Sequence, residues 1–257
     1  MKRSLRLAGK SKVSPLPPLA LPARIKRESR HLRGSQRSSL SRRQRAHHGV
    51  GEQAPATGEH DAAAHGGGAV DEAVGQGVLI VLDGTIESAR DAVKMHTTAL
   101  DTFQSPEVGA LGSVHDGEPV FYRSPLRRHT TRSAFSVEGV PELPRVAVLY
   151  AHADDDGFLV EAAVQAGCRG IVYAGMGNGS IPARAEAALA RAVAEGVVVV
   201  RSTRSAAGRV TRAEASYETN GFIASDTLNP AKARVLLQLT LLQTDDTAAI
   251  RKMFKIY

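Results

Sequence analysis

The sequence predicts an α/β fold for the C-terminal part of this chain. Short apolar runs typical of buried strands alternate there with segments whose apolar residues recur every three or four positions, as in helices. Glycine or proline residues stand at the ends of many of these segments. Strands that alternate with helices form a parallel sheet with helices on its faces. We therefore expect a small parallel-sheet α/β domain at residues 145–257.

Residues 69–124, before this domain, hold two β signals, and the family resemblance described below implies that they are the end of another α/β domain. Residues 77–82 form a continuous apolar run, which favours a strand buried on both faces. Residues 114–122 hold an Asp-Gly pair between β-prone flanks and predict a hairpin. Residues 125–144 are charged and polar and contain three prolines, so we interpret them as a linker.

The C-terminal domain has clear start and stop signals. Gly167 and Gly196 each follow a predicted helix, where glycine relieves the strain of the last turn. Asn229 followed by Pro230 predicts the start of a long helix, and Asp245-Asp246 the cap of a final one that reaches Tyr257. In chain order, the expected elements are a strand at 146–150, a helix at 158–166, a strand at 170–173, a helix at 182–195, strands at 197–201 and 222–224, and helices after 229 and after 246.

The first part of the chain differs in composition. Residues 1–50 hold 14 of the 33 Lys and Arg residues and only one acid, Glu28, so they carry a net charge of +13. The other 207 residues carry −6, and all eleven Phe and Tyr residues lie at or after Phe103. Residues 1–68 show neither helical nor strand periodicity and cannot bury enough apolar surface to offset chain entropy. They predict a disordered basic tail.

Several functional classes are excluded or disfavoured. Cys168 is the single cysteine, which excludes an internal disulfide and a cysteine metal cluster. No run reaches the roughly 18 apolar residues of a membrane span. Residues 16–21 are too short and too proline-broken for a signal-peptide core, so the chain as written predicts a cytoplasmic location. The histidines lack ordered ligand spacing, and we expect neither a metal nor a cofactor.

The loop at residues 175–179, Gly-Met-Gly-Asn-Gly, follows a predicted strand. It therefore lies at the carboxyl end of the sheet, where ligands bind in such folds. The dinucleotide spacing fails because the third glycine comes one residue early, and no Gly-Lys-Ser/Thr follows. A phosphate site is thus disfavoured. Two interpretations remain: a purely structural turn, or a loop that presents Asn178 to a substrate.

Several motifs, in the same order along residues 70–257, resemble those of bacterial type II L-asparaginases and glutaminase-asparaginases. The loop motif at 170–179 is one of them, and the set extends to a similar terminus, Phe-Lys-Ile-Tyr. The other matching stretches are residues 91–98, 103–105, 111–112, 200–204, 221–225 and 228–234. The resemblance implies hydrolysis of the side-chain amide of L-asparagine, sometimes L-glutamine, to the acid and ammonia, through a threonine-bound acyl intermediate. It also implies a periplasmic parent family and a homotetramer whose sites are completed across subunits.

The resemblance assigns roles to three residues. Lys94 matches a lysine that helps to pass on a proton, and such a role favours a buried amine with a lowered pKa. Asn178 matches a residue that reaches toward the substrate's amino group from a neighbouring subunit. Glu214 matches the acidic contact of the substrate's α-ammonium, which a carboxylate can pair with directly. From the residue alone, a solvated surface charge is the favoured interpretation of Lys94, and a solvated loop glutamate stays an alternative for Glu214.

The family's nucleophile motifs are missing from this sequence. Neither Thr-Gly-Gly-Thr-Ile nor Thr-Asp-Thr occurs, and Thr85 in Gly84-Thr85-Ile86 is positioned like an ordinary turn of the family. We therefore expect the chain alone to hydrolyse asparagine negligibly. One hypothesis for the missing motifs is that residues 1–68 are the product of a shifted reading frame. Two alternatives stay open: a non-catalytic domain that binds partner subunits, or weak nucleic-acid binding through the basic tail.

Overall fold

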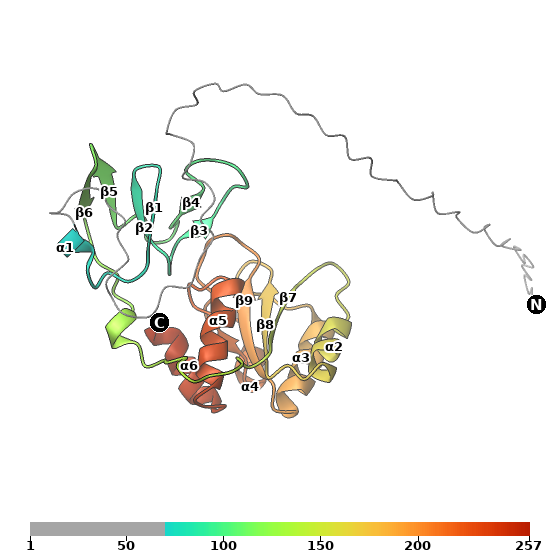
Figure 1. Ribbon diagram of the computed structural model, residues 1–257. Coiled ribbons are helices and arrows are strands. Elements are labelled where there is room, and N and C mark those ends of the chain that lie inside the picture. The colour runs from blue at the N-terminus through green and yellow to red at the C-terminus, as the bar shows by residue number, and fades with distance from the viewer. Residues whose placement is uncertain (1–69) are drawn as a thin grey trace, which may run out of the picture. The chain divides into compact units, whose positions relative to one another are not determined.

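The structure, a computed structural model, describes residues 70–257 (Figure 1). The basic tail expected at residues 1–68 lies outside the described residues. Within them, the chain forms a four-stranded antiparallel sheet, a two-stranded ribbon and a four-stranded parallel sheet covered by helices. The predicted α/β class is confirmed, and the parallel sheet lies in the C-terminal part as expected.

The antiparallel sheet follows a short helix, α1 (Val70–Ala73), and has the order β1-β2-β5-β6. Both of its hairpins turn on an Asp-Gly pair in the left-handed region, Asp83-Gly84 with φ of 50° and 70° and Asp116-Gly117 with φ of 52° and 86°. Positive φ at both central residues is the geometry that matches the twist of the flanking strands. The hairpin predicted at 114–122 is confirmed. The strands are β1 (Leu79–Leu82), β2 (Thr85–Ser88), β5 (Gly112–His115) and β6 (Glu118–Phe121).

The prediction that residues 77–82 form a strand buried on both faces is wrong for this structure. The strand exists as β1, but it pairs with β2 on one side only and stands at an edge of the sheet. Its Val81 side chain is 56% exposed. The antiparallel ribbon of β3 (Val93–Lys94) and β4 (Phe103–Gln104), which no periodicity indicated, follows in the chain.

The parallel sheet has its strands in chain order, β7-β8-β9-β10. Val172 in β8 lies opposite Val148 in β7 and Val200 in β9, so the centre of the sheet is continuous apolar packing. The strands predicted in this region are confirmed, although β8 and β9 each run further than expected. Their bounds are β7 (Val146–Tyr150), β8 (Gly170–Gly175), β9 (Val198–Thr203) and β10 (Ile223–Ala224).

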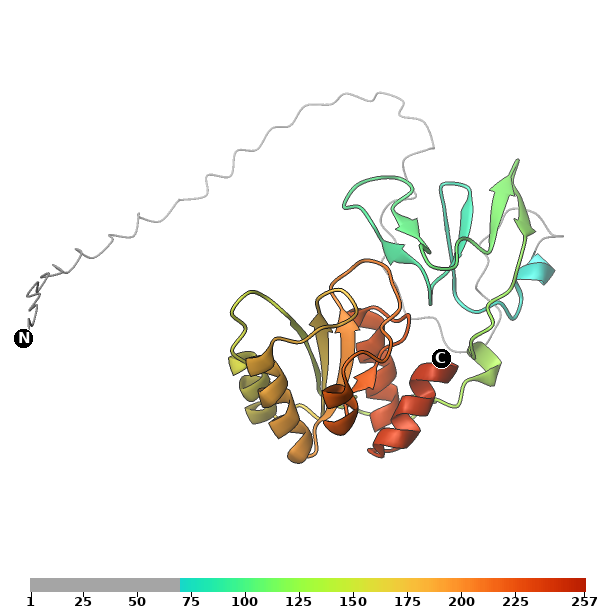
Figure 2. The same ribbon diagram turned by 180° about the vertical axis from the view of Figure 1, so that it is seen from behind.

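Helices cover both faces of this sheet (Figure 2). On one face α2 (Phe158–Gln165) and α3 (Ala183–Ala194) pack on Ile171 and Tyr173; on the other, α5 (Pro230–Leu241) and α6 (Thr247–Ile256) pack on Val172 and Val200. Successive residues of a strand point to opposite faces, and this alternation separates the two cores.

The predicted helix signals act as expected. The Asn229 side chain accepts a hydrogen bond from the Lys232 backbone N–H at 3.0 Å, and the Asp246 side chain accepts one from Ala249 at 2.7 Å. Each cap satisfies a backbone donor that the first helical turn leaves unpaired. The sequence did not indicate three short helical elements, α1, α4 (Ala215–Thr219) and a 3-10 turn at Thr130–Arg132, because none is long enough to show a period.

Candidate functional site

The glycine-rich loop reverses tightly at the carboxyl end of β8. Met176 and Ser180 exchange backbone hydrogen bonds at 3.0 and 2.7 Å, so the intervening residues form a narrow hairpin. A Cβ on Gly175 would lie 2.5 Å from the Gly179 carbonyl carbon, and Gly177 has a φ of 50° with open space around it. Glycine is therefore required at 175 for close approach and favoured at 177 for its backbone conformation.

Asn178, at the tip of this loop, is exposed, yet its side chain is held in place. Its Oδ1 accepts from the Thr211 backbone N–H at 2.8 Å, and its Nδ2 donates to the Thr211 hydroxyl at 3.0 Å. A backbone N–H can only donate, which fixes the orientation of the amide. These bonds use two of the four hydrogen-bonding positions of the amide. Asn178 thus joins two loops, and one lone pair of its Oδ1 is not used in these bonds.

The Arg201 side chain hydrogen-bonds to the backbone of the same two loops. It lies in β9, is only 2% exposed, and donates to the carbonyls of Asn178 at 2.6 Å, Gly179 at 3.2 Å and Thr211 at 2.6 Å. Its guanidinium carbon lies 4.5 Å from the centre of the Tyr217 ring, within the range of a cation–π contact. Burial lowers the pKa of the Arg201 guanidinium, and nearby acidic groups oppose that shift.

Glu214 is exposed and precedes α4, where its carbonyl accepts from the Tyr217 N–H at 3.2 Å. The Tyr217 hydroxyl in turn accepts from the Ile181 N–H at 3.1 Å, just after the glycine-rich loop. Against the lowering by burial, Tyr217, Glu218 and Glu214, in this order of effect, raise the pKa of the Arg201 guanidinium. Within residues 70–257, no hydrogen bond or ion pair joins the Glu214 side chain to Asn178 or Arg201, and Glu214 follows Thr211 by three residues in the loop bonded to Asn178.

Lys94 is placed differently from the sequence-based expectation. It lies in β3, its side chain is exposed, and its ammonium stands 5.3 Å from the centre of the Phe103 ring. The burial expected for a proton-relay lysine is not found. Among residues 70–257, no hydrogen bond or ion pair joins Lys94 to Asn178 or Glu214.

Thr85 occupies the position that the sequence indicated for it. It follows the Asp83-Gly84 turn as the first residue of β2, opposite Leu82. The turn itself is Asp83-Gly84, and Thr85 and Ile86 are strand residues. That Thr85 is not the nucleophile stays a prediction.

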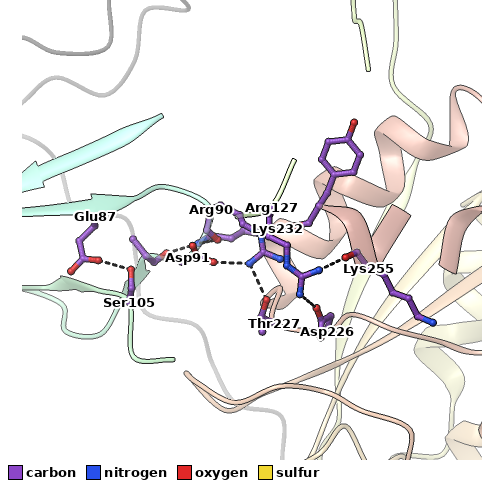
Figure 3. A network of polar contacts seen from close by, with 11 residues as sticks. Glu87, Arg90, Asp91, Ser105, Arg127, Asp226, Thr227, Lys232 and Lys255 are labelled. Carbon is purple, nitrogen blue, oxygen red and sulfur yellow. Dashed lines mark hydrogen bonds and ion pairs between the residues drawn. The ribbon is translucent and has the colours of Figure 1, made fainter. Parts of the chain in front are cut away.

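A second polar network ties residues 90–92 and the linker to the C-terminal helices and to the turn before α5 (Figure 3). Arg90 donates to the Tyr257 carbonyl at 2.5 Å and pairs with Asp91 at 2.6 Å, while the Lys232 ammonium donates to the carbonyls of Arg90 and Ala92. Burial lowers the pKa of Lys232 to about 8. Because the Lys232 amine is taken up by backbone carbonyls, we interpret this network as structural.

Asp226 anchors the other half of this network. Its carboxylate is buried, pairs with Arg127 at 2.5 Å and also accepts from Arg209. Its backbone has a φ of 58°, a left-handed conformation that aspartate tolerates better than most residues. Asp226 therefore fixes the turn between β10 and α5 and holds the linker residue Arg127 on it.

The described pockets do not coincide with the predicted site residues. A cavity of about 500 Å³ lies beside α5, lined by apolar side chains such as Phe135 and Leu239 together with Arg90 and Lys232. A narrow pocket of about 30 Å³ at the carboxyl end of β9 is bounded by Val93, Glu107 and Thr203, and has room for water rather than for an amino acid. Neither is lined by Lys94, Asn178 or Glu214.

Residues 70–257 hold neither a metal-binding cluster nor a membrane-spanning helix. No group of three or more His, Cys, Asp and Glu residues in this part of the chain is arranged to hold a metal ion. No helix in the same part combines the length and apolarity that crossing a bilayer requires.

Sequence reasoning did not single out Arg201 or Thr211 as site residues. A signal for Arg201 was present, because a charged residue directly follows the apolar run at 197–200 and must find partners once the strand is buried. Thr211 carries no comparable signal, since only the folded loops bring it to Asn178.

Residues 145–254 match the model of the glutaminase/asparaginase C-terminal domain, and residues 61–127 match the model of the N-terminal asparaginase domain. The chain is 45% identical over 186 residues to L-asparaginase 2 of Bacillus subtilis (strain 168), covering 72% of this chain and 49% of that protein. It is 43% identical over 183 residues to L-asparaginase 2 of Escherichia coli (strain K12), covering 71% and 53%.

A third relative carries a broader name. The glutaminase-asparaginase of Pseudomonas aeruginosa (strain ATCC 15692) is 37% identical over 185 residues, which cover 71% of this chain and 51% of the relative. The chain thus spans about half the length of these curated relatives. Two models of one family match in their natural order, and the resemblance seen in the sequence is confirmed: the chain belongs to the glutaminase/asparaginase family.

Proposed function

We propose that this chain contributes to the hydrolysis of the side-chain amide of L-asparagine to L-aspartate and ammonia. The observation that supports the proposal is the pair of loops at the carboxyl edge of the parallel sheet, in which Arg201 hydrogen-bonds to the carbonyls of Asn178 and Thr211, with Glu214 three residues after Thr211. The relatives named L-asparaginase and glutaminase-asparaginase support the same chemistry. They also make L-glutamine the second substrate to test.

In this proposal Asn178 and Glu214 recognise the α-ammonium of the substrate. Glu214 is exposed and can form a charge-assisted pair, and the free lone pair of Asn178 Oδ1 accepts without adding charge. Lys94 passes on the proton that the attacking threonine hydroxyl gives up. Because Lys94 is exposed here, that role requires further protein surface around it.

The attacking threonine is not supplied by a recognisable motif of this sequence, which contains neither Thr-Gly-Gly-Thr-Ile nor Thr-Asp-Thr. We therefore propose that the chain alone binds or orients rather than completing the acyl transfer. We likewise propose the division into a family-like segment at 69–124, a linker at 125–144 and a C-terminal domain at 145–257. The homotetramer and the binding of nucleic acid by the basic tail stay predictions.

Two measurements test the proposal. Ammonia release from L-asparagine and L-glutamine by the purified chain should equal the no-enzyme background, and a robust rate at nanomolar protein would refute the missing nucleophile. In an NMR titration with L-asparagine, amides near Asn178 and Glu214 should shift. Glu214→Gln should abolish those shifts, whereas Glu195→Gln, an exposed glutamate after α3, should leave them unchanged. Equal behaviour of the two variants would remove Glu214 from the site.

A further inference from the structure

The segment at residues 70–124 buries few of its own apolar side chains. Its buried hydrophobic residues are Ala73, Ile86, Ala92 and Leu111. Both hydrophobic core clusters of the described chain consist of buried residues between 146 and 254. The large hydrophobic side chains that are exposed in this segment are Val74, Val78, Val81, Met95, Leu100, Val108, Val120 and Tyr122.

The two edges of the antiparallel sheet differ in chemistry. The outer strand β6 reads Glu-Pro-Val-Phe, with a charge and a proline, which are features that prevent a further strand from pairing. The other outer strand, β1, reads Leu-Ile-Val-Leu and carries no charge, proline or bulge. Within residues 70–257 no strand pairs with the second side of β1. An uncharged apolar edge of this kind favours the addition of a strand.

The sequence of this strand points the same way. A continuous apolar run is typical of a strand with neighbours on both sides and covered faces, yet Val78 and Val81 are 62% and 56% exposed here. The N-terminal asparaginase model matches only residues 61–127, and the matched region is about half of each relative. The pattern of β1 thus corresponds to an interior strand whose neighbour is supplied by a further part of the N-terminal domain.

We propose that the β1 edge, Leu79–Leu82 with the flanking Val78, is the docking surface for the remainder of an asparaginase N-terminal domain, which adds a strand beside β1 and covers its exposed valines. Backbone hydrogen bonds along β1 give the register, and burial of Val78 and Val81 gives most of the affinity. This inference depends on family membership and not on the proposed amide hydrolysis, so binding is measured without an activity assay.

The test uses the full chain and, as a separate polypeptide, the portion of the Bacillus subtilis L-asparaginase 2 N-terminal domain that lies outside the match. The dissociation constant is measured by biolayer interferometry with the chain immobilised, and amide hydrogen exchange is followed by mass spectrometry. Addition of the fragment should protect the amides of residues 79–82 and leave those of residues 118–121 unchanged.

Two matched variants locate the surface. Val81→Lys places a charge on the β1 edge and should weaken binding at least tenfold, whereas Val120→Lys, at a 45% exposed valine of β6, should change it less than twofold. Both positions are exposed, and unchanged far-UV circular dichroism establishes that each variant is folded.

Four outcomes would overturn the proposal. The first is that the folded chain does not bind the fragment, and the second is that the two lysine variants weaken binding equally. The third is that amides 79–82 are protected from hydrogen exchange in the chain alone and lose this protection when residues 1–60 are deleted. The fourth is that the protection of these amides rises with the concentration of the chain alone. The third result would assign the edge to this chain's own N-terminal segment, and the fourth to a second copy.

Discussion

Replacing Arg201 with methionine should destabilise the chain strongly. The change keeps a long apolar stem but removes a guanidinium that is 2% exposed and donates to three carbonyls, of Asn178, Gly179 and Thr211. A hydrogen bond from a charged donor contributes about 1.5–3 kcal/mol, and a buried acceptor left unpaired costs about 1–3 kcal/mol. The cation–π contact with Tyr217 adds about 1–2 kcal/mol.

These contributions do not add fully. Asn178 and Thr211 are exposed residues, so water can replace the guanidinium at their carbonyls, and only the bond to Gly179 is fully buried. We therefore expect a loss of about 3–4 kcal/mol for Arg201→Met. Arg201→Lys keeps the charge but not the planar fork of donors, and should recover less than half of that loss.

Urea unfolding followed by far-UV circular dichroism measures the free energies, with Arg191→Met as control. Arg191 pairs with Glu161, but both side chains are more than half exposed, and such a pair contributes at most about 1 kcal/mol. Hydrogen exchange gives a local readout, because the Thr211 amide bonded to Asn178 should exchange faster in Arg201→Met. If the free energy of unfolding of Arg201→Met lies within about 1 kcal/mol of that of the unmodified chain, Arg201 does not hold these two loops together.

Three further predictions follow from the described contacts. Gly175→Ala should open the loop and lower the free energy of unfolding by about 2–4 kcal/mol, because the added Cβ would lie 2.5 Å from backbone atoms. Gly177→Ala meets no atom and should lower it by about 1–2 kcal/mol because of the positive φ. Urea unfolding measures both losses, and the reverse order would contradict this prediction. The free energy of unfolding of the chain, minus that of Lys232→Met, should rise between about pH 8 and pH 10.5. In this range the Lys232 amine has lost its proton in the folded chain but keeps it in the unfolded chain. A difference that does not change with pH would mean that Lys232 is not desolvated. Asp226→Asn keeps a residue type that tolerates a left-handed backbone but weakens the pairs with Arg127 and Arg209. It should therefore lower the free energy of unfolding by about 1–3 kcal/mol. An unchanged melting temperature would mean that the Asp226 charge contributes no stability.

Much of the C-terminal domain could be predicted because its local signals agree with its tertiary structure. The apolar run at 146–150, the glycines after two helices and the Asn229-Pro230 start each specify an element without reference to distant residues. The burial of β1 could not be predicted correctly, because a strand pattern does not tell whether a neighbouring strand is present. The same limit applies to α4, which is too short to show a period.

The candidate site divides along similar lines. The loop position of Asn178 at a strand end followed from the fold class, but its bonds to Thr211 join residues 33 positions apart and have no sequence signature. The three predicted roles came from motif resemblance, and they stay predictions. Lys94 is exposed in β3, whereas the proton-relay role implied burial, and no local pattern in the sequence indicated this exposure.

The order of strands in the parallel sheet has a consequence for synthesis of the chain. Strands that are neighbours in the sheet are also neighbours in the sequence, but each parallel pair is closed by a crossover through a helix, so we expect residues 146–254 to fold more slowly than a helical bundle of similar length. The segment that carries the bare β1 edge is translated earlier and waits in solvent without a core of its own. We expect this nascent segment to be a binding site for chaperones that hold apolar strands, and the finished C-terminal domain to need none.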